Sequence, residues 1–135
     1  MLTTFPEAKA RGIVRTRSGG KCEVARAGVC LGEAHSMHHR RKEGRLWNPA
    51  NILHTCGDGT RGCHGWIESH PTLANEEGLW LFAGEKPETT SCHMRWENLM
   101  SWFTLDDEGL LHWDTTLSEP VAPATTHRMI FICRR

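Results

Sequence analysis

Long apolar runs are missing from this sequence, and so are internal repeats and low-complexity tracts. A helix needs about 20 consecutive apolar residues to cross a bilayer, and no run here approaches that length. The first fifteen residues, MLTTFPEAKARGIVR, lack the apolar central segment of a secretory signal. These absences argue against a membrane protein and against an exported one. We expect one soluble, cytoplasmic domain, because 135 residues can bury a modest core.

A net charge is also absent, yet the charges are unevenly distributed. Residues 8–45 contain ten Lys or Arg and three Asp or Glu, whereas residues 46–120 contain three and twelve. The last fifteen residues add three arginines. A basic block of this kind suits a polyanion such as DNA or RNA. A solvated helix face that keeps the protein in solution is the alternative.

The order of helix and strand signals predicts an α+β fold. FPEAKARGIVRTRSGG predicts a short N-terminal helix, since its proline suits a first turn and the glycine pair ends it. CHGWIESH and TLANEEG indicate two more short helices. The short apolar-aromatic runs GLWLFAG, LMSWFTL and GLLHWD predict a small antiparallel sheet or hairpin that carries Trp80, Trp102, Phe103 and Trp113.

Six cysteines and nine histidines are present, and without an export signal they favour metal ligation over disulfides. Seven residues separate Cys22 from Cys30, and six residues, three of them glycine, separate Cys56 from Cys63. Each pair can form a knuckle around one metal, and two knuckles make a structural four-thiolate zinc site. The alternative is four buried thiols that act as small apolar residues, which the polar, glycine-rich loops disfavour. Cys92 and Cys133 have no partner at such a spacing and are interpreted as non-ligands.

The segment between the two knuckles contains His38, His39 and Asn51. A third histidine, His64, directly follows the last cysteine of the second knuckle. The order HH…N…CH is carried by MHHRR, NPANILHTCGDGTRGCHGWIESHP and EEGL, between about residues 20 and 80. It resembles the HNH endonuclease family in its zinc-stapled, bacteriophage form. The resemblance implies a ββα-metal core, in which two strands joined by a long loop precede a helix and one divalent ion lies between them.

The resemblance also implies how the chain is divided. We expect the nuclease core, with its N-terminal helix and zinc knuckles, over residues 1–80. A short β-hairpin extension over 81–118 would pack on this core, and 119–135 would form a flexible tail.

Individual residues receive roles from the same resemblance. His38 takes the metal-ligand position and His39 the general-base position, and neighbouring residues of a strand do face opposite sides. A neutral imidazole near pH 7 is well matched to removing a proton from water. Asn51 matches the asparagine that orients the base or its loop, because an amide donates and accepts without titrating.

The second half of the ion site follows the last cysteine. His64 matches the second metal ligand, at the start of a helix. The family places another ligand one helical turn later, and here that position is Glu68 instead of histidine. The catalytic ion could be Mg2+, Mn2+, Ni2+ or Zn2+, because all accept a carboxylate. His70 is the rival ligand, although it would lie well around the helix from His64.

Four cations follow the proposed base directly: Arg40, Arg41, Lys42 and Arg45. We expect them to bind the phosphates that flank the cleaved bond without reading the DNA sequence.

These features together predict a metal-dependent DNA endonuclease that leaves 5′-phosphate and 3′-hydroxyl ends. A monomer that nicks one strand is the simplest case, and double-strand cutting would need two active sites or two visits. A zinc-knuckle module that binds nucleic acid without catalysis is the alternative.

For phage enzymes of this type, the resemblance implies genome packaging beside a terminase as one role. Restriction, homing and degradation of host DNA are the others, and the residues do not select among them.

Overall fold

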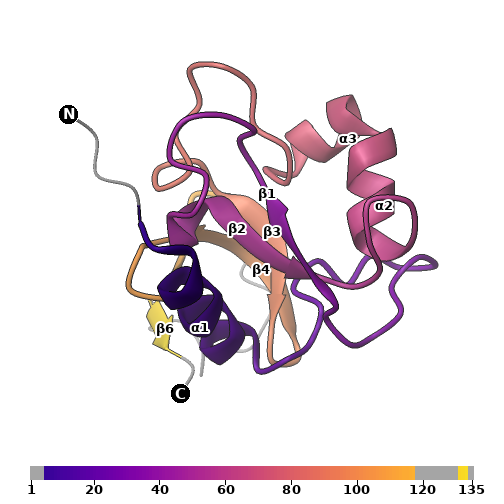
Figure 1. Cartoon of the computed structure of the whole chain (residues 1–135), viewed down its shortest axis with the longest axis horizontal. Helices are drawn as coiled ribbons and strands as arrows, with labels where there is room; N and C mark the ends of the chain where they lie inside the picture. The colour runs from indigo at the N-terminus through magenta and orange to yellow at the C-terminus, as the bar shows by residue number, and fades with distance from the viewer. Residues whose placement is uncertain (1–4, 118–130, 134–135) are drawn as a thin grey trace.

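Three helices and two antiparallel sheets form the α+β fold of the computed structural model, which describes residues 5–117 and 131–133 (Figure 1). The helices are α1 (Glu7–Ser18), α2 (Gly62–Ser69) and α3 (Pro71–Glu76), and η1 (Pro49–Asn51) is a short 3-10 turn. The strands are β1 (Ser36–His39), β2 (Ile52–Thr55), β3 (Cys92–Trp96), β4 (Leu99–Leu105), β5 (Leu110–Trp113) and β6 (Phe131–Cys133). The α+β class and the three helices predicted from the sequence are confirmed.

The N-terminal helix α1 packs against β2. Ala10 and Val14, one helical turn apart, are buried in a cluster with Ile52 of β2. Arg17 is buried on the same helix and forms two hydrogen bonds, of 2.7 and 2.8 Å, with the carboxylate of Glu23. This ion pair joins the end of α1 to the first cysteine knuckle.

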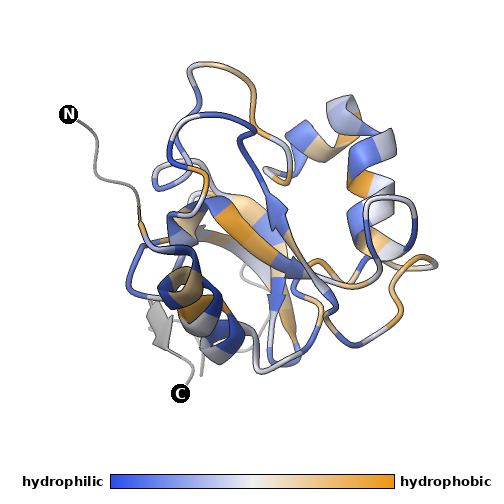
Figure 2. Cartoon of the chain, viewed as in Figure 1, coloured by the Kyte–Doolittle hydropathy of each residue, from blue (hydrophilic) through white to orange (hydrophobic). Residues whose placement is uncertain are grey.

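The strands β1 and β2 form a two-stranded sheet that α2 follows in the chain. Their register pairs His38 with Leu53 and His39 with Ile52. Alternation along β2 sends Ile52 toward α1 and Leu53 into a second cluster that includes Ile67 of α2. Figure 1 shows α1 on one side of this strand pair and α2 with α3 on the other. Figure 2 shows the apolar stretch of β2 between them.

The C-terminal region forms a four-stranded antiparallel sheet in the order β3-β4-β5-β6. Phe103 and Leu111 are fully buried on its inner side, in one cluster with Leu53. Trp80 was expected on a strand, and that expectation is wrong. Its neighbours Leu79 and Leu81 donate backbone hydrogen bonds to α3 and to residue 40, so this segment is a connection and not a strand.

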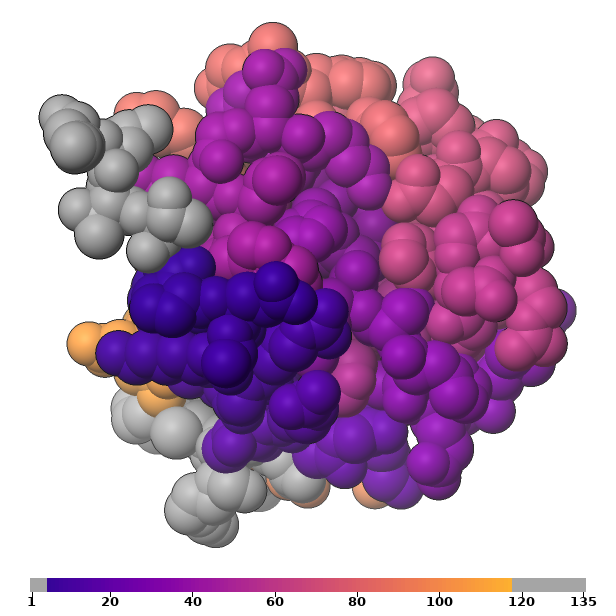
Figure 3. Space-filling model, viewed as in Figure 1, coloured from indigo at the N-terminus to yellow at the C-terminus, as the bar shows by residue number. Residues whose placement is uncertain are grey.

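Most of the predicted tail, 119–135, lies outside the described residues. Within it, Phe131–Cys133 forms β6, whose Cys133 pairs with Leu110 of β5. Of the helices in the described ranges, none has the length and apolar character needed to cross a bilayer. The space-filling view in Figure 3 shows the purple atoms of β1 and the chain next to it between α1 and the pair α2 and α3.

Candidate metal sites

The sulfur atoms of Cys22, Cys30, Cys56 and Cys63 lie within 4.8 Å of one another. Those of Cys30 and Cys56, from different knuckles, are 3.9 Å apart. Four sulfurs at about 2.3 Å from a zinc ion stand about 3.8 Å apart at the corners of a tetrahedron. The Cys30–Cys56 separation has this value and the other sulfurs are within 4.8 Å of one another, so the four cysteines could hold a structural metal ion, as their spacing predicts.

Backbone N–H groups of the knuckles point at all four sulfurs. The donors are the amides of Ala25, Arg26, Leu31, Gly32 and Cys63, at 3.1 to 3.5 Å. Such donors stabilise thiolates. The interaction with Cys63 lowers the pKa of Cys22 to about 5, whereas burial raises the pKa of Cys30 to about 11. Four crowded sulfurs cannot all ionise alone, and a divalent cation would remove this conflict, so the donor set fits zinc.

The second knuckle turns at Gly57, whose φ is 75°. A Cβ atom there would lie 2.1 Å from the carbonyl oxygen of Arg61. Only glycine therefore permits the close approach of the two ends of this loop, which brings the amide of Cys63 to 3.1 Å from the sulfur of Cys56.

A second group of ligand atoms joins β1 to α2. The ligand atoms of His38, His64 and Glu68 lie within 4.8 Å of one another. Glu68 Oε2 is 3.4 Å from His38 Nδ1 and 3.5 Å from His64 Nε2. His70 lies outside this group, since its Nδ1 is 2.9 Å from the Trp66 carbonyl oxygen and its ring stacks on Trp66. The helix therefore brings Glu68, and not His70, beside His64.

In His38 and His64, the ring nitrogen that faces away from Glu68 forms a hydrogen bond that fixes the orientation of the ring. His38 Nε2 lies 2.6 Å from the carbonyl oxygen of Leu79, which can only accept, so Nε2 carries the proton. His38 Nδ1 is buried and has no hydrogen-bond partner among the described residues. His64 Nδ1 lies 2.7 Å from Ser36 Oγ, which leaves Nε2 toward Glu68. A buried lone pair without a partner is costly, and an imidazole held by its other nitrogen is characteristic of metal ligands.

The charge states of the three residues also suit a cation. Burial lowers the pKa of His38 to about 4 and lowers the pKa of His64 as well. Glu68 is ionised, because the ammonium group of Lys42 lies 2.7 Å from its Oε2 and favours the charged carboxylate. At neutral pH the site therefore has two neutral imidazoles and one carboxylate, which are the ionisation states that bind divalent ions.

His39 is half-buried on the opposite face of β1 from His38. Its Nδ1 lies 2.8 Å from the carbonyl oxygen of Leu46, so Nδ1 donates and the lone pair is on Nε2. The ring of Trp47 meets the imidazole edge-on, with 4.6 Å between centroids. Burial lowers the pKa of His39, so the imidazole is neutral near pH 7.

Asn51 anchors the loop between β1 and β2. Its Oδ1 accepts from the backbone N–H of Arg41 at 2.8 Å. Its Nδ2 donates to the carbonyl oxygens of Arg41, at 3.1 Å, and of Leu46, at 3.2 Å. The Leu46 carbonyl thus binds both the amide of Asn51 and the imidazole of His39, so Asn51 fixes the group that orients His39.

Arg40 does not lie on the surface with the other cations of the basic run. Its side chain is fully buried. The guanidinium donates at 2.6 to 2.9 Å to four carbonyl oxygens, those of Ala50, Gly78, Pro87 and Thr90. The assignment of Arg40 to nucleic-acid binding is therefore wrong. Continued alternation from β1 places Arg40 on the inward side with His38, where it joins β1 to two distant loops.

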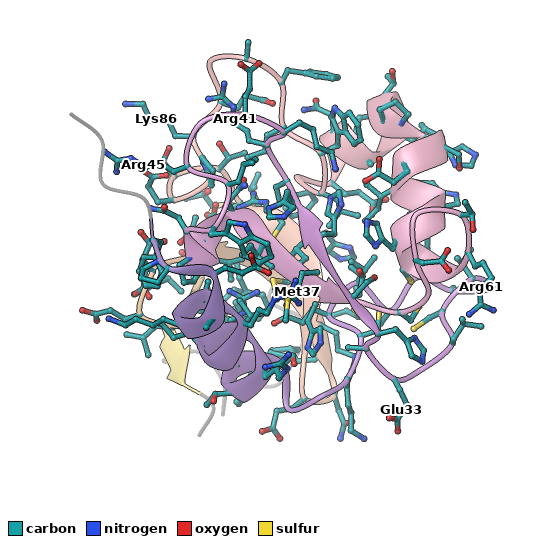
Figure 4. All side chains as sticks on the ribbon, in the orientation of Figure 1. Glu33, Met37, Arg41, Arg45, Arg61 and Lys86 are labelled. Carbon is teal, nitrogen blue, oxygen red and sulfur yellow. The ribbon has the colours of Figure 1, made fainter. Side chains whose placement is uncertain are left out.

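The other three cations are accessible. Arg41 is half-buried, and Lys42 and Arg45 are exposed. Arg41, Arg45 and Lys86 line a hollow of about 360 Å3, and Figure 4 shows them at one end of the molecule. Lys42 instead extends to α2, where its Nζ lies 2.7 Å from Glu68 Oε2.

Two groups that orient the site were missed in the sequence. Ser36 lies two residues before His38, on the same face of β1, so strand alternation could have identified it. Leu79 contributes only a backbone carbonyl, for which its side chain gives no signal.

No family model, no curated protein and no solved structure matches the chain.

Proposed function

We propose that the protein is a metal-dependent DNA endonuclease of the HNH type, which hydrolyses phosphodiester bonds to 5′-phosphate and 3′-hydroxyl ends. The observation that carries the proposal is the group of His38, His64 and Glu68, whose ligand atoms lie within 4.8 Å of one another. His39 follows His38 directly, with its imidazole oriented by a backbone carbonyl. A module that only binds nucleic acid would need neither this ligand set nor an oriented imidazole beside it.

The reaction requires an activated water and stabilisation of charge on the phosphate and on the departing 3′ oxygen. A divalent ion held by His38, His64 and Glu68 would supply Lewis-acid stabilisation of that charge. His39 accepts the water proton at Nε2, while its Nδ1 stays bound to the Leu46 carbonyl. Asn51 holds the same carbonyl and keeps His39 in its orientation.

The four-cysteine site adjoins the elements that carry the ion ligands. Cys56 directly follows β2, and Cys63 directly precedes His64 in α2. A zinc ion bound to these cysteines would therefore hold the start of α2 against β2 and position His64 opposite His38.

Arg41, Lys42 and Arg45 provide positive charge for phosphates on either side of the cleaved bond. Contacts of this kind predict low sequence specificity and binding that weakens steeply with salt. We place the enzyme, as a monomer, in the cytoplasm of a bacterial host, with phage genome packaging beside a terminase as the first role to test.

Supercoiled plasmid tests the proposal directly. Purified zinc-loaded protein is incubated with plasmid and Mg2+, Mn2+, Ni2+ or Zn2+, and we expect relaxed or linear product with at least one ion. His39→Ala should lower the rate by about 100-fold or more, because it removes the general base. His70→Ala is the matched control, since this exposed histidine lies outside the ligand group, and it should cut like the wild type.

Equal rates for His39→Ala and the wild type would refute the assignment of the base. If the protein binds DNA but cuts none with any of the four ions, the zinc-knuckle binding module is the better description.

A further inference from the structure

The ammonium group of Lys42 lies beside the proposed catalytic ion site. Lys42 belongs to the loop that follows β1, and its Nζ is 2.7 Å from Glu68 Oε2 on α2. The ring of Trp80 is also close, with Nζ 4.9 Å from its centroid. A carboxylate and an aromatic face are both attractive to a cation, so this lysine has two favourable contacts.

The oxygen that Lys42 contacts is the same one that faces the two histidines. Glu68 Oε2 is 3.4 Å from His38 Nδ1 and 3.5 Å from His64 Nε2. A divalent ion bound by these three residues would use Glu68 Oε2 as its carboxylate ligand. The ammonium group of Lys42 and the divalent ion could not both contact this oxygen, because like charges repel strongly in a partly buried site.

We propose that Lys42 is a displaceable counter-cation, which neutralises Glu68 in the metal-free protein and is released from Oε2 when the divalent ion binds. The side chain is 39% exposed, so the ammonium can move into solvent without disturbing the core. Once released, it stands next to the ion and can bind a phosphate oxygen of the DNA strand. This second step rests on the proposed nuclease function, whereas the displacement itself requires only the ion site.

An ordinary surface ion pair would have a different consequence. Such pairs contribute little to stability, and removing one leaves the affinity of a separate site unchanged. A competing cation lowers the affinity of the ion, so its removal must raise that affinity. The sign of the change in metal affinity therefore distinguishes the two cases.

The test is the affinity for Mn2+, measured by isothermal titration calorimetry on zinc-loaded protein. Mn2+ prefers oxygen and nitrogen ligands to thiolates, so its heat reports on the His38, His64 and Glu68 group. We expect Lys42→Met to bind Mn2+ about tenfold more tightly than the wild type, and Lys42→Arg, which keeps the charge, to bind more weakly than Lys42→Met.

Lys86→Met is the matched control. It removes the same charge from an exposed lysine that lines the hollow beside Arg41, and its affinity for Mn2+ should stay within about twofold of the wild type. Retention of one zinc per chain, measured by mass spectrometry, verifies that each variant is folded. Affinity of Lys42→Met equal to or weaker than that of the wild type would overturn the proposal.

Plasmid cutting at saturating Mn2+ tests the second step. Lys42→Met should cut about tenfold more slowly, although its ion site is filled, because the phosphate has lost a positive partner. Unchanged cutting by this variant would refute the phosphate contact. If the wild type cuts no DNA while Lys42→Met still binds Mn2+ more tightly, the nuclease proposal fails and the counter-cation stands.

Discussion

At the scale of single residues, His38, His39, Arg40 and Arg41 illustrate what a short stretch of sequence can and cannot predict. Their burial alternates from buried to half-buried, as expected for a strand and its extension. The histidine doublet suggests two roles, because adjacent residues of a strand have opposite orientations. Arg40 and Arg41 looked equivalent, because a run of basic residues does not indicate where the strand ends. If the alternation of the strand is extended by two residues beyond His39, Arg40 falls on the buried side and Arg41 on the opposite side.

The burial of Arg40 leads to a prediction about stability. Arg40→Lys should lower the free energy of unfolding by about 2–4 kcal/mol, because an ammonium cannot reach carbonyls on opposite sides of a guanidinium and leaves some of them unpaired. Urea denaturation measures the change. Arg41→Lys, at a half-buried position, is the control and should stay within about 0.5 kcal/mol of the wild type. Equal stability of the two variants would contradict the structural role of Arg40.

At the scale of elements, the helices were predictable and the first strand of the larger sheet was not. Helix signals depend on local features, such as proline at the start and glycine at the end, which α1 contains. In β3, the buried residues Cys92 and Met94 alternate with His93 and Arg95. This alternation is less conspicuous than the apolar run GLWLFAG, which the structure uses as a connection. Apolar runs indicate burial, and only alternation over several residues indicates a strand with one buried face.

The second knuckle gives a prediction at this scale. Gly57→Ala should lower zinc retention and destabilise the protein by about 2 kcal/mol or more, since a Cβ atom would lie 2.1 Å from a backbone oxygen at a positive φ. Gly59→Ala, in the same loop, meets no atom within 4 Å and should retain zinc. Mass spectrometry gives the zinc content, and thermal denaturation the stability. If both variants lose zinc to the same extent, zinc retention depends on the number of glycines in the loop and not on the turn at Gly57.

At the scale of the whole molecule, the knuckles and the larger sheet share one hydrophobic cluster. It includes Cys22, Cys56 and Cys63 together with Phe103 and Leu111. Spacing in the sequence could pair the cysteines, but it could not place them against a sheet that begins about thirty residues later, because such contacts depend on tertiary packing. A metal bound to these cysteines should therefore stabilise the core as a unit, including strands that contain no ligand.

Two cysteine variants test this coupling. Cys56→Ala should lose the zinc and lower the Tm by about 10 °C or more, because a ligand is removed from the centre of the shared core. Cys92→Ala is the matched control, since this thiol is equally buried but belongs to β3; it should keep one zinc and lower the Tm by about 4 °C, the effect of a small cavity. Near-ultraviolet circular dichroism follows the same transition in a background with Trp47, Trp66 and Trp80 replaced by phenylalanine, so that the signal comes from the tryptophans of the sheet, Trp96, Trp102 and Trp113. If Cys56→Ala loses its zinc while these tryptophans melt at the wild-type temperature, the knuckles and the sheet fold independently, and the metal serves only to position His64.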